Sequence, residues 1–394
     1  MPTRRDFLHG IALLGGTVGT GGALAGGLQA TAAPGRDPRA ARSQSRLRLL
    51  VLGGTGFIGP HLVNTILSRG HKLTVFNRGR SEPRLYADLY GDVEQLVGDR
   101  DDDLTALEGR EWDAVIDNSG YTPDQVRASA QLLADSVGHY IFTSTRAVYA
   151  DYTRSPMDED APVGIAGVPA DEWTGYGPLK AVAERDVQEA FGPDRTSVVR
   201  PPIITGPGDH TDRFTFWYDR VDRGGEVLAP GSPDDPIQYV DVRDLVDFMV
   251  HLAEERITGI YNTVAPAAPL SSAEFLYGLR ATTGNPVTFT WVDWDFLADH
   301  DMHGGDQIAA WRAPRGDDLH YGRIDNTRAI EAGMTFRPLA TTATDTLAWW
   351  RDNVAAEGGE LRSGYSDARE AELLAAWRAR RSTTTPRPDL RQAH

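Results

Sequence analysis

The chain has 394 residues, of which 40% are hydrophobic and 24% are charged. These fractions are typical of a folded globular protein, and they exclude a wholly disordered chain or a protein with many membrane spans. The 40 Lys and Arg against 56 Asp and Glu give a net charge of −16, which opposes nucleic-acid binding. Cysteine is absent, so thiolate catalysis, thiolate metal sites and disulfides are excluded.

The first 32 residues predict an export signal. Arg4 and Arg5 precede an uncharged, glycine-rich stretch over residues 10–29, and the small residues Ala30-Thr31-Ala32 provide a cleavage site. This order is typical of a twin-arginine signal. We therefore expect the twin-arginine translocation machinery as a partner, export to the cell envelope or the extracellular space, and cleavage near Ala32. Residues 33–46 are polar and without periodicity, and they are predicted to be a linker.

A buried strand is predicted over residues 47–52, followed by a glycine-rich turn and a helix to about residue 69. The spacing G-x-x-G-x-x-G lets the turn bend tightly, lets the backbone approach a pyrophosphate, and lets the helix pack on the strand. A second strand over residues 72–76 completes the first strand–helix–strand unit. The residues predicted to bind a dinucleotide at this turn are Gly53, Thr55, Gly56, Phe57, Ile58 and Gly59.

The end of the second strand indicates which dinucleotide binds. An NAD-selective site places an acidic residue there, whereas this chain has Asn77 and Arg78. A guanidinium complements a 2′-phosphate through charge-assisted hydrogen bonds, so we expect NADP(H) in preference to NAD(H). Two later strands, over residues 93–97 and 112–116, also end near the predicted cofactor. They add Asp99, Arg100, Asn118 and Gly120 to the predicted cofactor site.

Hydroxyl side chains follow a further strand over residues 140–142. Beyond them, Tyr176 and Lys180 have the i, i+4 spacing that places two side chains on one helix face. An ammonium beside a phenol lowers the pKa of the phenol, which would let Tyr176 exchange a proton with a carbonyl or alcohol near neutral pH. A Ser or Thr hydroxyl that donates to the same substrate oxygen completes such a site.

In this order along the chain, the motifs resemble the short-chain dehydrogenase/reductase superfamily, and within its extended branch the NAD-dependent epimerase/dehydratase family. The resemblance implies an α/β fold with a doubly wound parallel sheet of the Rossmann type and a smaller C-terminal substrate-binding region. It implies Thr145 as the catalytic hydroxyl, with Ser144 as the alternative, Tyr176 as the acid/base and Lys180 as its partner. Thr143, Tyr176 and Lys180 are also expected beside the cofactor.

The resemblance extends over residues 47–353 and predicts how the chain is divided into regions. Residues 47–200 are predicted to be the core NAD(P)-binding Rossmann region. Residues 201–353 are predicted to be a substrate-binding or cap region with returning Rossmann elements, and residues 354–394 a C-terminal helix and tail. The amphipathic pattern of that helix predicts packing on the body of the protein or on a partner subunit. A homodimer is expected, because two helices of the Rossmann region resemble those that pair in family dimers.

The substrate is predicted to be a small polar alcohol or ketone, sugar-like or otherwise. Nucleotide-sugar members of the family usually carry an Asn where this chain has Ile203, which speaks against a nucleotide sugar. No metal site is expected, since Asp209 and His210 lack a third ligand. The candidate substrate contacts are Ser144, Arg146, His210 and Arg213. At least two of three aromatic residues, Phe214, Trp217 and Tyr218, are expected to be helix core. The tryptophans expected to close a cap over the substrate are Trp291, Trp294 and Trp311.

Three functions fit the sequence. The first is an NAD(P)-dependent oxidoreductase that moves a hydride while Tyr176 transfers a proton. The second is an epimerase or dehydratase that keeps NAD(P) tightly bound and returns the hydride within one turnover. A dehydratase usually has an acidic residue where Arg146 follows Thr145. The third is a non-catalytic nucleotide-binding or RNA-binding Rossmann protein. Residues 76–79 resemble the corresponding segment of chloroplast stem-loop-binding proteins, but the net charge of −16 opposes RNA binding.

Overall fold

The structure, a computed structural model, describes residues 46–169, 172–305 and 307–384. The predicted export signal over residues 1–32, the predicted linker up to residue 45, and residues 385–394 lie outside these ranges. No helix in the described part of the chain is both long enough and apolar enough to cross a membrane.

In the described part of the chain, seven parallel strands form the central sheet, in the order β10-β6-β5-β4-β1-β2-β3. The chain starts in the middle, runs outward to β3, and then returns to β4 to build the other half. This confirms the predicted doubly wound fold, and the strand order reverses between β1 and β4. The strands are β1 (Arg48–Leu52), β2 (Lys72–Asn77), β3 (Glu94–Val97), β4 (Ala114–Asp117), β5 (Tyr140–Thr143), β6 (Thr196–Val199) and β10 (Gly259–Tyr261).

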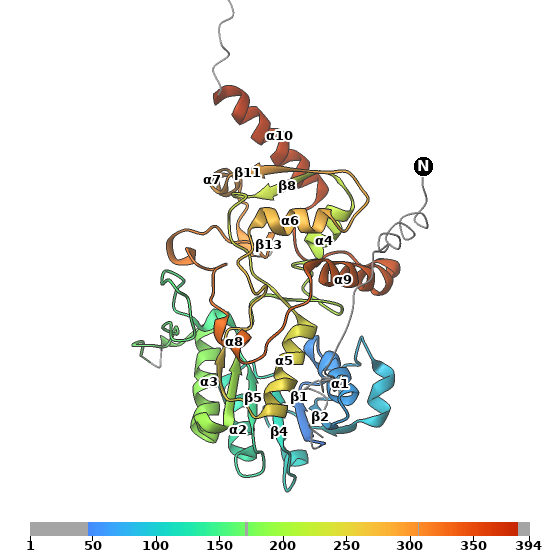
Figure 1. The fold of residues 1–394 in the computed structure, drawn as a ribbon, viewed down its shortest axis with the longest axis vertical. Coiled ribbons are helices and arrows are strands. Elements are labelled where there is room, and N and C mark those ends of the chain that lie inside the picture. The colour runs from blue at the N-terminus through green and yellow to red at the C-terminus, as the bar shows by residue number, and fades with distance from the viewer. Residues whose placement is uncertain (1–45, 170–171, 306, 385–394) are drawn as a thin grey trace, which may run out of the picture. The chain divides into compact units, whose positions relative to one another are not determined.

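The apolar run of β1 is explained by helices on both faces of the sheet. Successive strand side chains point to opposite faces. Leu49 and Val51 join the core beneath α1 and α5, whereas Leu50 and Leu52 join the core beneath α2 and α3. Figure 1 shows these two helix pairs on either side of the sheet. The helices are α1 (Ile58–Ser68), α2 (Pro123–Leu133), α3 (Tyr176–Phe191) and α5 (Val242–Glu255).

A second region, with its own aromatic core, is built mainly from residues after β6. Phe214, Trp217 and Tyr218 are all buried in this core, which confirms their predicted packing role. Two strands, β8 and β11, pair in parallel within the region, and β7 pairs with β9. The strands are β7 (Ile204–Thr205), β8 (Gly225–Pro230), β9 (Val240–Asp241), β11 (Val287–Val292), β12 (Gly304–Gly305) and β13 (Ile308–Ala309). The helices are α4 (Thr215–Asp222), α6 (Ser272–Arg280), α7 (Trp294–Asp299), α8 (Thr327–Glu331), α9 (Leu339–Asn353) and α10 (Asp367–Thr384).

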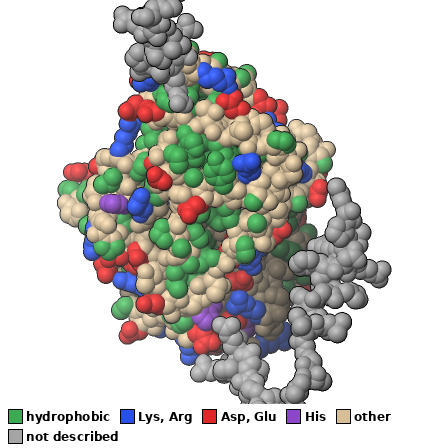
Figure 2. Space-filling model, turned by 45° about the horizontal axis from the view of Figure 1, so that its top comes forward, with side chains coloured by type: hydrophobic (Ala, Val, Ile, Leu, Met, Phe, Trp, Pro, Cys, Tyr) green, Lys and Arg blue, Asp and Glu red, His purple; other side chains and the backbone are tan. Residues whose placement is uncertain are grey.

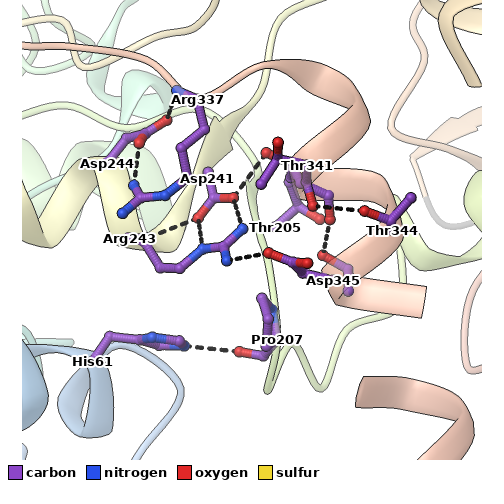
Figure 3. A network of polar contacts seen from close by, with 12 residues as sticks. His61, Thr205, Pro207, Asp241, Arg243, Asp244, Arg337, Thr341, Thr344 and Asp345 are labelled. Carbon is purple, nitrogen blue, oxygen red and sulfur yellow. Dashed lines mark hydrogen bonds and ion pairs between the residues drawn. The ribbon is translucent and has the colours of Figure 1, made fainter. Parts of the chain in front are cut away.

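A polar network joins the Rossmann region to the second region (Figure 3). Asp241 caps α5, because one of its carboxylate oxygens accepts the Arg243 backbone N–H at 2.8 Å. The Arg243 guanidinium contacts both Asp241 and Asp345 of α9. Thr342, also on α9, donates its hydroxyl to Asp241 at 2.8 Å. Since Asp241 is fully buried, these bonds fix α9 against the start of α5.

The C-terminal helix α10 packs on the body of its own chain, which answers the question that the sequence left open. Leu373 and Leu374 are buried in the core of the second region. Glu370 pairs with Arg220 of α4 at 2.7 Å and also accepts the Leu228 backbone N–H at 2.9 Å. Both members of the ion pair are buried. The helix continues to Thr384.

The surface is mixed in charge on the face that Figure 2 draws. Acidic and basic side chains are scattered among apolar ones there. A nucleic-acid binding face typically gathers Lys and Arg into one patch or stripe, and the face drawn has no such stripe among the described residues.

We expect Glu370→Gln to lower the free energy of unfolding by about 3 kcal/mol, because it leaves the Arg220 guanidinium buried without its counter-charge. Asp367→Asn is the matched control on the same helix: its carboxylate pairs with Arg223 but is 74% exposed, so the loss should stay below about 1 kcal/mol. Urea unfolding followed by tryptophan fluorescence measures both. Equal losses in the two variants would contradict the packing of α10 described above.

His139 is a buried neutral imidazole beneath the sheet. Its Nε2 lies 2.7 Å from the Ser197 hydroxyl, and that hydroxyl donates to the Ile257 carbonyl, so Nε2 carries the proton. Burial lowers the pKa of His139 to about 4. An unfolded histidine has a pKa near 6.5. As the pH falls from about 6.5 to 4, the unfolded chain therefore binds a proton that the folded chain does not, and stability is lost.

His139→Gln keeps an N–H donor for Ser197 but cannot titrate. Between about pH 7 and pH 5, this variant should lose about 1–2 kcal/mol less unfolding free energy than the wild type. Urea titrations at the two pH values measure the difference. If the wild type and the variant lose the same amount, the imidazole is already charged in the folded protein.

Candidate functional site

A cavity of about 710 Å³ lies at the carboxyl ends of the central strands, where the second region faces the sheet. Every site residue predicted from the sequence lines this cavity except Gly59. The lining residues among them are Gly53, Thr55, Gly56, Phe57, Ile58, Asn77, Arg78, Asp99, Arg100, Asn118, Gly120, Thr143, Ser144, Thr145, Arg146, Tyr176, Lys180, His210 and Arg213. The fold thus brings together residues that lie up to 160 positions apart, from Gly53 to Arg213.

The three glycines of the turn have different roles. Gly53 has a φ of 92°, and a Cβ there would lie 2.5 Å from the Ser119 Cβ. A Cβ at Gly59 would lie 2.3 Å from the Gly54 backbone, so Gly59 lets α1 pack against the turn and serves the fold rather than the cavity. A Cβ at Gly56 would meet nothing within 4 Å. The backbone at Gly56 is therefore open to the cavity.

The turn fits the pyrophosphate of a dinucleotide. The helix α1 begins at Ile58, directly after the turn, and its unpaired N–H groups and dipole favour an anion. The side-chain nitrogens of Asn77 and Asn118 are buried and meet no acceptor in the described part of the chain. A ligand with several oxygens would supply the acceptors that these donors lack.

The turn after β2 presents basic side chains at the other end of the cavity. The Asn77 side chain accepts the Gly79 N–H at 2.8 Å, and this turn leaves Arg78 exposed. Within the described ranges, no hydrogen bond or ion pair engages the Arg78 guanidinium. Two further lining residues were not predicted: Arg80, which lies 3.3 Å from Asp99, and Ser81, whose hydroxyl lies 3.0 Å from that of Thr55. Because Arg80 and Ser81 follow Arg78 closely in the sequence, their positions could have indicated that they also line the cofactor site.

Arg100 lines the cavity, but its guanidinium is held elsewhere. It makes two hydrogen bonds to Asp117, at 2.6 and 2.8 Å, and a third to Ser129. The Tyr140 hydroxyl donates to the same carboxylate at 2.7 Å. Arg100 is 8% exposed. It therefore holds the segment after β3 to the end of β4, whereas the sequence suggested a cofactor contact.

Tyr176 and Thr145 meet because a glycine follows the tyrosine. Tyr176 is the first residue of α3, and Thr145 precedes a short 3₁₀ turn over Arg146–Val148. A Cβ at Gly177 would lie 2.0 Å from the Ala147 carbonyl oxygen, so only glycine lets the helix start this close to the turn. Thr145 and Tyr176 both line the cavity, and the Thr145 side chain is one of the groups that lower the pKa of Tyr176.

The predicted effect of Lys180 on Tyr176 is wrong. Although Tyr176 is 54% exposed, desolvation of its hydroxyl raises its pKa, and Tyr121 raises it further. The contacts with Thr145 and Arg213 act in the opposite direction, and Lys180 is not among the groups that shift this pKa. The phenol is therefore protonated at neutral pH and is suited to donate a proton to a substrate oxygen.

Lys180 instead joins the ends of two central strands. Its ammonium donates to the Gly120 carbonyl at 2.8 Å and to the Thr143 carbonyl at 2.7 Å, and it lies 4.0 Å from the centre of the Phe142 ring. Burial lowers its pKa to about 8. An ammonium has three donors, so one N–H stays available to a ligand in the cavity.

The remaining wall combines apolar and basic groups. The Ser144 hydroxyl is buried without a hydrogen-bond partner among the described residues. Arg362 and Ser363, from the segment before α10, hydrogen-bond the backbone of the lining residues His210 and Thr211. The lining residues that the sequence did not indicate include Tyr121, Gln125, Tyr152, Pro201, Pro202, Arg312 and Tyr321.

Two further expectations concern the cavity. The tryptophans expected to close it do not line it: Trp311 packs on Trp217 with ring centres 4.6 Å apart, and Trp294 donates to Asp235 at 2.7 Å. Trp311 belongs to the core of the second region, and the partly buried Trp291 and Trp294 pack against it. The described residues contain no group of three or more side chains that could hold a metal ion.

Several curated proteins resemble this chain. The epimerase family protein SDR39U1 of Bos taurus is 27% identical over 254 residues, which cover 61% of this chain and 82% of that protein. The chloroplast stem-loop binding protein of 41 kDa b of Arabidopsis thaliana is 26% identical over 335 residues, covering 77% and 85%. The 2-alkyl-3-oxoalkanoate reductase of Stenotrophomonas maltophilia is 27% identical over 263 residues, covering 61% and 77%.

The fold is also found in solved structures. The Bordetella bronchiseptica enzyme WbmG, in complex with NAD and UDP, superposes with a TM-score of 0.56 at 18% identity, covering 84% of this chain and all of that one. Residues 49–263 match the NAD dependent epimerase/dehydratase family. This match spans the glycine-rich turn, the paired Thr145 and Tyr176, and Lys180, and the chain therefore belongs to the NAD dependent epimerase/dehydratase family.

Proposed function

We propose that this protein is an NADP(H)-dependent oxidoreductase that acts on a polar alcohol or ketone. The observation that carries the proposal is that Thr145 and Tyr176 line the same cavity as the glycine-rich turn. The turn offers an open backbone and a helix N-terminus for a pyrophosphate. The hydroxyl pair lies where a substrate oxygen would need proton donors.

A bound nicotinamide supplies the hydride in reduction and accepts it in oxidation. In reduction, the Tyr176 hydroxyl donates its proton to the substrate carbonyl oxygen as the carbonyl carbon gains the hydride, and the product is an alcohol. Thr145 donates a second hydrogen bond that polarises the same oxygen. Lys180 holds the backbone at Gly120 and Thr143 and offers its third N–H to the cofactor ribose. Oxidation runs the same steps in reverse.

The wall of the cavity favours this reaction over chemistry on a nucleotide sugar. Ile203 lines the cavity at the position where nucleotide-sugar members of the family usually have an Asn. Pro201 and Pro202 precede it in the wall, and none of these three side chains can hydrogen-bond a diphosphate. A relative that is 27% identical is named as a reductase of an oxoalkanoate, which agrees with an exchanging dehydrogenase.

The preference for NADP(H) rests on Arg78. Its exposed guanidinium stands where an NAD-selective site has an acid, and no described carboxylate neutralises it. We expect Arg78→Ala to raise the Kd for NADPH by about tenfold, since it removes charge-assisted bonds to the 2′-phosphate. The Kd for NADH should change little. Fluorescence titration of the full-length chain with each nucleotide measures both values, and an equal change in the two would contradict the assignment.

The function itself is tested by screening the full-length chain with NADPH against polar ketones and with NADP⁺ against the matching alcohols. With an active substrate, Tyr176→Phe should lower kcat by about 10²- to 10⁴-fold, because it removes the proton donor. The Kd for NADPH should stay unchanged. If the phenylalanine variant turns over at the wild-type rate, Tyr176 is not the acid. If the protein carries a nucleotide that never exchanges, the hydride is returned internally and the protein is an epimerase or a dehydratase.

A further inference from the structure

Arg146 is a buried arginine fixed in the wall of the cavity. It directly follows Thr145, and its backbone N–H donates to the Pro201 carbonyl at 2.9 Å. Its guanidinium carbon lies 3.7 Å from the centre of the Tyr321 ring, and Nη1 donates to the Tyr321 carbonyl at 3.2 Å. The residue is 3% exposed. These contacts hold the guanidinium in one place in the wall of the cavity.

The charge of Arg146 is uncompensated, unlike that of each other buried arginine in the described part of the chain. Arg100 pairs with Asp117 at 2.6 Å, Arg200 with Glu184 at 2.7 Å, and Arg220 with Glu370 at 2.7 Å. No carboxylate among the described residues pairs with Arg146, and its Nη2 meets no acceptor there. Because a buried charge is costly without a partner, this position calls for an anion that the chain itself does not supply.

Two further arginines add positive charge at this end of the cavity. Arg312 also lies against the Tyr321 ring, with its guanidinium carbon 4.5 Å from the ring centre, and Arg213 lines the same wall. The carboxylates that line the described cavity are Asp99, beside Arg80 at the other end, and Asp209. Burial raises the pKa of Asp209, and one of its carboxylate oxygens already accepts the Thr211 backbone N–H at 2.8 Å and the Thr211 hydroxyl at 2.7 Å.

We propose that Arg146 binds a carboxylate of the substrate, so that the substrate is a hydroxy acid or an oxo acid. This rests on the oxidoreductase function proposed above and specifies the class of alcohol or ketone. A guanidinium matches a carboxylate through parallel hydrogen bonds. The Arg146 guanidinium shares this wall with the Asp209 carboxylate, so the site suits a monoanionic carboxylate better than a phosphate dianion.

The test uses two sets of compounds, and the members of each set differ from one another at one group. The first set is D-glucuronate, D-glucose and D-glucose 6-phosphate, and the second is 2-oxobutanoate and butanone. Calorimetry measures their binding to the full-length chain, with and without saturating NADP⁺. In at least one set, the carboxylate should bind about tenfold more tightly than its neutral counterpart, as expected for a hydrogen bond to a charged group. Arg146→Met should reduce this ratio to about one.

Two controls separate the possible failures. Arg146→Met should keep the wild-type Kd for NADPH, which shows that the variant is folded. Arg110→Met removes an exposed arginine paired with Glu94 on β3, outside the cavity, and should keep the carboxylate preference. The proposal is overturned if neither acid is preferred, if Arg146→Met keeps the preference, or if the phosphate binds more tightly than the carboxylate. If the wild type does not bind NADPH, the oxidoreductase function is refuted instead. The preference for the carboxylate is then still measured in the absence of nucleotide, so the two failures can be told apart.

Discussion

The reversal of strand order between β1 and β4 is the constraint on which the site depends. Parallel strands end at one edge of the sheet, and where their order reverses, the following loops diverge and leave a crevice. The turn after β1, Asn118 after β4 and the hydroxyls after β5 all face that crevice. The position of the cavity thus follows from topology, and the side chains decide only what it binds.

Buried charges show how the second region is secured and where a ligand is expected. Arg243 with Asp345, and Arg220 with Glu370, join elements that are distant in sequence. The buried arginines Arg100, Arg200 and Arg220 each have a carboxylate as counter-charge within the chain. Arg146 departs from this rule in the wall of the cavity. An arginine buried in a cavity wall without a carboxylate partner is expected where a ligand supplies the counter-charge.

Much of the fold and of the site could be predicted from the sequence because the signals were local. The glycine spacing after β1, the apolar strands and the i, i+4 pair of Tyr176 and Lys180 each depend on neighbouring residues. The raised pKa of Tyr176 could not be predicted, because it arises from desolvation and from Tyr121 rather than from Lys180. Tyr321 reaches Arg146 from 175 residues away, and no spacing rule connects them. The ion pair between Arg100 and Asp117 could not be predicted either, because no spacing rule connects the two residues.

The central claim is that one cavity places a nicotinamide dinucleotide beside Thr145 and Tyr176. A crystal structure of the full-length chain with NADP⁺ tests it most directly. The account predicts the pyrophosphate at the turn from Gly53 to Ile58, the 2′-phosphate beside Arg78, and the nicotinamide ring next to the Tyr176 hydroxyl. A crystal grown at saturating NADP⁺ that shows no nucleotide in the cavity, or a nicotinamide ring remote from Tyr176, would contradict it.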